Sequence, residues 1–149
     1  MQSKAVKIFT LFAVGALIYG LIEIWARGFT HITMGVLGGA SMVVIHLLND
    51  ERRQGMNYFL QISIAAFFIT AIEFLAGEIL NKYLQMNIWD YSDIPLNFDG
   101  QICLPFVFLW VILSAIGTAL DDLIRWRMFK EPRNFSYLKS EPPLSVDAN

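Results

Sequence analysis

The sequence predicts an all-α protein, an integral membrane bundle of four helices with a structured loop between the third and fourth helices. Two observations predict this fold class. Of the 149 residues, 56% are hydrophobic and only 16% are charged, whereas a soluble domain has about 45–50% apolar and about 25% charged residues. The apolar residues also gather in four long stretches. With a mean hydropathy of +0.50, the chain is too apolar for a disordered or fibrous protein, and its net charge of -2 argues against a nucleic-acid partner.

Each apolar stretch approaches the roughly 20 helical residues that cross a hydrocarbon core about 30 Å thick. The predicted spans cover about residues 8–25, 32–48, 58–80 and 104–120. Lys4 and Lys7 precede the first span, as they would in a signal peptide, but that span runs into Glu23 and Arg27 without a small-residue cleavage site. We therefore expect an uncleaved helix, and a single transmembrane domain over residues 1–130.

Lysine and arginine are distributed unevenly between the two ends of the predicted helices. Nine of the eleven lie before the first span, between the second and third spans, or after the fourth, and only Arg27 and Lys82 lie in the other two loops. Because cytoplasmic loops carry the excess of basic residues, we predict that both termini are cytoplasmic and that the loop over residues 81–103 is outside. Residues 131–149 hold three of the five prolines and no apolar periodicity, which predicts a disordered cytoplasmic tail.

Polar side chains near the membrane gather on the predicted outer side, where they come from three segments of the chain. The candidates for a ligand-binding or polar site are Glu23, Arg27, His31, Glu73, Glu78, Asn81, Trp89, Asp90, Tyr91, Asn97 and Gln101. Six of the thirteen acidic residues lie on this side, so the predicted outer face is acidic and the inner face is basic. Trp89 and Tyr91 are typical of membrane interfaces, and we expect their loop to fold back over the helices as a cap.

Glu73 is the most informative candidate because it lies within the third span. It precedes Asn81, at the outer end of that span, by eight residues, which is about 12 Å along a helix. An ionisable group at this depth normally faces the bundle interior and a partner. We expect Glu73 to meet Arg27, His31 or a loop donor, to be protonated, or to bind a cation. The alternative is a polar network that only fixes the packing of the first and third helices.

The sequence predicts no cofactor and no metal site. The spacing of His31 and the outer glutamates matches no recognised metal-ligand motif. The single cysteine, Cys103, excludes an intramolecular disulfide and a cysteine-rich zinc site. No GxxxxGK[ST] motif occurs in these residues, so the chain is not itself a P-loop ATPase.

The inner end of the fourth helix carries a possible ion pair. Asp121 and Arg125 are four residues apart and can pair along one helix face. We expect both to lie on a solvated helix end that Trp126 anchors at the interface. His46, near the inner end of the second span, is expected to be packed or interfacial.

Three runs of the sequence are distinctive. They read GALIYGLIEIWARGFTHITMGVLGG (Gly15 to Gly39), ITAIEFLAGEILN (Ile69 to Asn81) and WDYSDIPLNFDGQICLPFVFLW (Trp89 to Trp110). These runs resemble the Putative ABC-transporter type IV family, and the resemblance extends from about Gly15 to Arg125. It implies a four-helix transporter permease of a bacterial inner membrane. The family-like positions are Glu23, Arg27, Gly28, His31, Met34, Glu73, Gly77, Asn81, Trp89, Asp90, Tyr91, Pro95, Asn97, Gly100 and Gln101, and the chain departs from the family pattern at Phe29 and Thr30.

The leading functional prediction is a multi-pass protein of the cell membrane, either a transporter permease or a transport-associated subunit, with an outward-facing polar site. Its expected partners are the lipid bilayer and a second copy, a separate transporter subunit or an ATPase. A membrane enzyme that acts on a lipid or polyprenyl substrate, with a glutamate and His31 as acid and base, stays open. So does a structural or assembly protein whose polar network only holds the helices.

Overall fold

Four long apolar helices make up most of the chain, as the sequence predicts. The computed structural model describes residues 3–135 and residue 137. The elements are α1 (Lys4–Arg27), α2 (Ile32–Arg53), α3 (Tyr58–Gly77), its π-helical continuation η1 (Glu78–Tyr83), β1 (Asn97–Phe98), β2 (Ile102–Cys103) and α4 (Leu104–Phe129). By length and composition, α1, α2, α3 with η1, and α4 can each cross a membrane. The all-α fold class is confirmed.

Polar side chains start three of the helices. Ser3, His31 and Asn57 each accept a hydrogen bond from a backbone N–H of the following turn, which satisfies donors that have no partner within the helix. The starts of α2, α3 and α4 agree with the predicted spans. Helices α2 and α4 extend beyond the predicted span ends, to Arg53 and Phe129, because charged side chains just past those ends are paired between the two helices.

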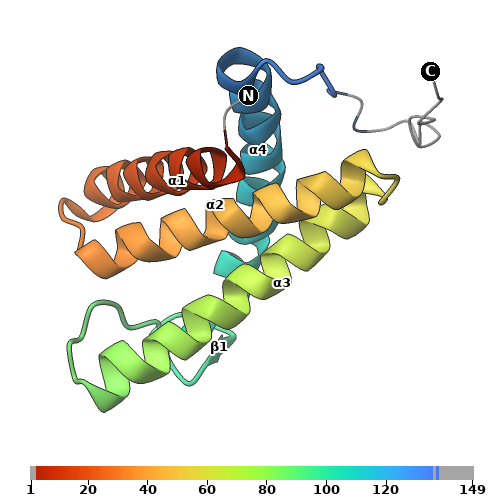
Figure 1. Ribbon diagram of the computed structural model, residues 1–149. Coiled ribbons are helices and arrows are strands. Elements are labelled where there is room, and N and C mark those ends of the chain that lie inside the picture. Colours follow the sequence, from red (N-terminus) through yellow and green to blue (C-terminus); the bar gives the residue numbers. More distant parts are fainter. Residues whose placement is uncertain (1–2, 136, 138–149) are drawn as a thin grey trace, which may run out of the picture.

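Helix α2 is the centre of the arrangement. It packs antiparallel along α1 and also contacts α3 and α4, and Figure 1 shows α3 diverging from α2 while α4 crosses behind α2. One apolar cluster joins Ile45 of α2 to Ala65 and Ile69 of α3 and Trp110 of α4. We name the end of the bundle that holds the N-terminus of α1 and the C-terminus of α4 the tail end, and the opposite end the loop end.

Glycines allow the close approach of α1 and α2. A Cβ on Gly15 would lie 2.5 Å from Met42 Cβ and 2.7 Å from the carbonyl oxygen of Gly38. A Cβ on Gly39 would lie 2.7 Å from the ring of Phe12. Because side chains larger than hydrogen would clash here, these residues let the two backbones pack tightly, as small residues do between membrane helices.

The segment between η1 and α4, residues 84–103, folds onto the loop end. It contains the two-residue strands β1 and β2, which pair antiparallel with Asn97 opposite Cys103. Ile88 and Trp89 are buried against Met34 of α2. We call this segment the cap, and its position agrees with the predicted structured loop between the third and fourth helices.

Candidate functional site

Glu73 lies at the point where α3, α4 and the cap meet. Its side chain is buried, with 3% exposure. Oε2 accepts a hydrogen bond from Trp110 Nε1 at 2.8 Å, and Oε1 accepts one from the Tyr91 hydroxyl at 3.2 Å. The ring of Trp110 stacks on Tyr19 of α1 with 5.7 Å between centroids. Of the partners that the sequence allowed for Glu73, the structure provides a loop donor, Tyr91, and adds a tryptophan of α4.

Tyr91 meets Glu73 as a neutral hydrogen-bond donor. Burial and the adjacent Glu73 carboxylate both raise the pKa of the Tyr91 hydroxyl above its usual value. Its ring also stacks on Phe106 of α4, with 4.7 Å between centroids. Tyr91 therefore connects the cap to the helices through a hydrogen bond at its tip and through ring contact along its face.

A second buried network holds the base of the cap. Asn81 of η1 donates from Nδ2 to Gln101 Oε1 at 2.9 Å and accepts from the backbone N–H of Ile88 at 2.7 Å. Trp89 Nε1 donates to the carbonyl oxygen of Gln101 at 3.0 Å. All of these side chains are buried, so the cap is attached by satisfied polar groups and not only by apolar contact.

Glu23 and Arg27 form an ion pair at the end of α1. Arg27 also donates from Nη1 to the carbonyl oxygen of Ile88 at 3.0 Å, and its guanidinium lies over the ring of Phe29. The pair thus joins α1 to the cap. The described hydrogen bonds and ion pairs do not join it directly to Glu73.

The remaining candidates, Glu78 of η1 and Asp90 and Asn97 of the cap, are closer to the surface. Lys82 pairs with Glu78 and with Asp99, and this hydrogen-bonded lysine lowers the pKa of the Asp99 carboxyl. Hydrogen bonds from Ser92 lower the pKa of Asp90. Asn97 donates to the carbonyl oxygens of Ser92 and Ile94. These residues shape the exposed surface of the cap.

His31 stands apart from the glutamates. Its Nδ1 lies 2.9 Å from Thr33 Oγ1 and accepts the backbone N–H of Thr33 at 3.3 Å, which caps α2. The residue borders an apolar groove of about 480 Å³ between α1 and α2. None of the described hydrogen bonds or ion pairs joins His31 to a glutamate, and within the described ranges no three His, Cys, Asp or Glu side chains gather closely enough for a metal ion.

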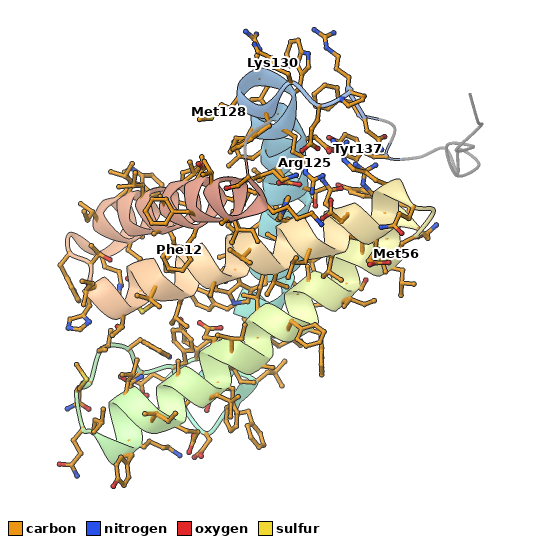
Figure 2. All side chains as sticks on the ribbon, viewed as in Figure 1. Phe12, Met56, Arg125, Met128, Lys130 and Tyr137 are labelled. Atoms are coloured by element: carbon orange, nitrogen blue, oxygen red, sulfur yellow. The ribbon has the colours of Figure 1, made fainter. Side chains whose placement is uncertain are left out.

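A second cluster of buried polar side chains, which was not predicted from the sequence, lies at the tail end. We name it the tail-end cluster, and it lies where the ends of α2 and α4 meet, near Arg125 in Figure 2. Its charged and polar members are His46, Asn49, Asp50, Arg52, Arg53, Asp121, Asp122, Arg125 and Glu131. Asp121 and Asp122 have 0% exposure and Arg125 has 2%. The prediction of a solvated helix end at Asp121 and Arg125 is therefore wrong.

Asp121 is enclosed by three donors. Its Oδ1 lies 2.8 Å from His46 Nδ1. Its Oδ2 accepts from Asn49 Nδ2 at 2.7 Å and from Arg125 Nε at 2.9 Å. The predicted pairing of Asp121 with Arg125 is thus present, but inside the bundle. His46, with 2% exposure, is packed as expected and contributes a hydrogen bond to the cluster.

Asp122 connects both arginines of the α2 C-terminus. Oδ2 accepts from Arg52 Nη2 at 2.7 Å, and Oδ1 accepts from Arg53 Nη2 at 2.8 Å and from Asn49 at 2.9 Å. Tyr137 adds a hydrogen bond to Oδ2 at 3.2 Å. A buried carboxylate is stabilised only when such partners replace its water shell, so Asp122 fixes α2 against α4.

The first residues after α4 close this cluster. Glu131 pairs with Lys7 of α1 at 2.6 Å and with Arg125 at 3.2 Å. Burial opposes ionisation of Glu131, but its cationic partners outweigh that effect and lower the pKa of the carboxyl. Thus residues 131–135 and 137 include contacts with the bundle, and the rest of the segment predicted as a disordered tail lies outside the described residues.

The comparisons with known proteins point to a family. Residues 15–136 match the family model described as Putative ABC-transporter type IV, a region that contains α2, α3, α4, the cap and most of α1. No solved structure matches the chain.

Proposed function

Because the chain belongs to the Putative ABC-transporter type IV family, we propose that it is a permease-like or transport-associated membrane subunit of an ABC-type transport system. Four helices long and apolar enough to cross a membrane make it a multi-pass membrane protein. These 149 residues contain no P-loop motif, so ATP-driven transport requires a separate ATPase. The proposed location is the cell membrane, in bacteria the inner membrane.

One structural observation favours a subunit over a self-contained permease. The most buried carboxylates, Glu73, Asp121 and Asp122, accept hydrogen bonds from side chains of neighbouring helices. Paired groups of this kind hold helices in register, whereas groups that line a transport path face water or substrate. This supports a chain that completes a transport path with a second copy or another transporter subunit.

The cap supplies the proposed outward-facing polar site. Glu73, Asn81 and Gln101 hold its base, while Asp90 and Asn97 shape its surface. A loop held in this way presents a fixed surface to a substrate or a partner subunit. Binding then does not have to pay the entropy cost of ordering the loop. The apolar bundle and this polar cap together support a recognition role at the loop end.

The excess of basic residues at the tail end supports a cytoplasmic location for both termini. Single cysteines introduced at exposed Gln54 and Asn87, in a Cys103→Ser background, test this orientation. We expect a membrane-impermeant maleimide to label the cysteine at 87 in intact cells and the one at 54 only after the membrane is opened. The reverse labelling pattern would overturn the proposed topology.

Isolation of the complex tests the proposed subunit role. The tagged full chain, purified in mild detergent from membranes of the cells that naturally make it, should migrate well above its 17.0 kDa mass. It should bring an ABC-type ATPase in constant proportion, with ATP hydrolysis that an untagged control preparation lacks. The proposal would be refuted if the purified protein were a monomer without a partner and if deletion of the chain left transport by these cells unchanged.

A further inference from the structure

We propose that the C-terminal end of α4 binds the phosphate of an anionic phospholipid headgroup. The site consists of Arg127, Lys130 and Arg133 around the ring of Trp126. These residues line a pocket of about 430 Å³, together with Glu131 and Pro132. The pocket is separate from the cap and does not include Asp121 or Asp122, although it shares Glu131 with the tail-end cluster.

The chain bends back to form this pocket. Lys130 takes a left-handed conformation with φ of 57° and ends α4, and the backbone N–H groups of Lys130 and Glu131 both donate to the carbonyl oxygen of Arg125. This turn returns Arg133 to the side of Trp126. The Arg133 guanidinium carbon lies 3.7 Å from the ring centroid, and that of Arg127 lies 4.4 Å away. Figure 2 shows Lys130 at this end of the bundle.

The pocket has a net positive charge because its one acidic residue, Glu131, is neutralised by cations outside the pocket. Glu131 is paired with Lys7 and Arg125, both outside the residues that line the pocket. Within the described part of the chain, none of the ion pairs involves Arg127, Lys130 or Arg133, and all three are exposed. Three cations are therefore available to one anionic ligand.

Stacking on tryptophan leaves the arginines able to bind phosphate. A cation–π contact uses the flat face of the guanidinium, whereas its N–H groups point outward in the plane and suit the paired oxygens of a phosphate. The ring contact thus holds each guanidinium in place before the ligand arrives. This arrangement is better suited to phosphate than three freely moving lysines.

The position of the pocket favours a lipid over a soluble phosphate. It lies at the end of a helix that is apolar enough to cross a membrane, and Trp126 is a residue typical of the headgroup region. Phosphates of anionic lipids concentrate at this depth and attract basic residues close to the surface.

Lipid binding can be measured on the full chain in nanodiscs with labelled phosphatidylglycerol, with phosphatidylcholine as the neutral comparison. We expect phosphatidylglycerol to be preferred. Removal of one cation in Arg133→Gln should weaken that binding roughly fivefold. Lys4→Gln is the matched control, because it also removes one exposed cation at the tail end but outside the pocket, and it should change the affinity less than twofold. Arg127→Gln should repeat the Arg133→Gln effect.

Equal affinity for the two lipids, or an equal loss in Arg133→Gln and Lys4→Gln, would overturn the proposal. Titration of the detergent-purified protein with inorganic phosphate distinguishes the two sources of the ligand. Binding of free phosphate that is tighter than that of phosphatidylglycerol, and is lost in Arg133→Gln, would replace the lipid with a soluble phosphate compound.

Discussion

Replacement of Asp122 by alanine should lower the free energy of unfolding in detergent micelles by about 3–5 kcal/mol. The substitution leaves Arg52, Arg53 and Asn49 without the carboxylate that they share at 2.7–2.9 Å. Asp122 itself has 0% exposure, so water cannot readily take over the hydrogen bonds that its carboxylate makes. The measurement is chemical or thermal unfolding of the purified variant, in which size-exclusion chromatography gives the fraction that remains folded.

Two further variants separate charge from position in this experiment. Asp122→Asn keeps the side-chain volume and one acceptor oxygen but removes the negative charge, so we expect it to lose most of the same stability. Glu51→Ala removes an exposed carboxylate from the same end of the bundle and should change stability by no more than about 0.5 kcal/mol. If Asp122→Ala behaved like Glu51→Ala, the buried ion pairs would not hold α2 against α4.

The fold was largely predictable because apolar stretches and local caps are properties of the sequence itself. The starts of α2, α3 and α4 follow directly from them. The π-helical turn was not predictable, because it depends on a partner distant in sequence. Asn81 in that turn bonds to Gln101 and to the backbone of Ile88, and residue spacing alone does not show such contacts.

The candidate site was predicted only in part. The depth of Glu73 in an apolar span indicated a buried partner, and the structure contains two, Tyr91 and Trp110. The tail-end cluster was missed because Asp121 and Arg125, taken alone, match an ordinary surface pair. The available signal was the whole face of α4, where the small or polar residues Ser114, Thr118, Asp121 and Arg125 recur every three or four positions and are all buried. A polar face this long indicates polar partners on the neighbouring helices, which the structure places at Gln61 of α3 and at His46 and Asn49 of α2.

Replacement of Glu73 by alanine should release the cap, and Cys103 reports that release. Cys103 is the single cysteine and has 2% exposure in β2, so a maleimide should label it slowly in the native protein. Without Glu73, Trp110 Nε1–H and the Tyr91 hydroxyl lose their acceptor in a buried place, which costs about 2–3 kcal/mol. Because labelling requires opening of the cap, its rate should rise roughly 30-fold or more.

The conservative variants make this expectation specific to the hydrogen bonds. Glu73→Gln keeps one acceptor oxygen and should raise the Cys103 labelling rate by less than tenfold. Glu78→Gln is the control, because Glu78 and its partner Lys82 are both partly exposed, with 33% and 39% side-chain exposure, and surface pairs contribute little; we expect a native rate.

Gly77→Ala tests the attachment of the cap by a different route. It removes no hydrogen-bonding group, but its Cβ would lie 2.5 Å from Gln101 Oε1 and 2.9 Å from Gln101 Cβ. The methyl group should push Gln101 away from Asn81 and so accelerate Cys103 labelling. Native rates in both Glu73→Ala and Gly77→Ala would mean that apolar contacts of Ile88 and Trp89 hold the cap without the buried polar network. The proposed fixed recognition surface would then lose its physical basis.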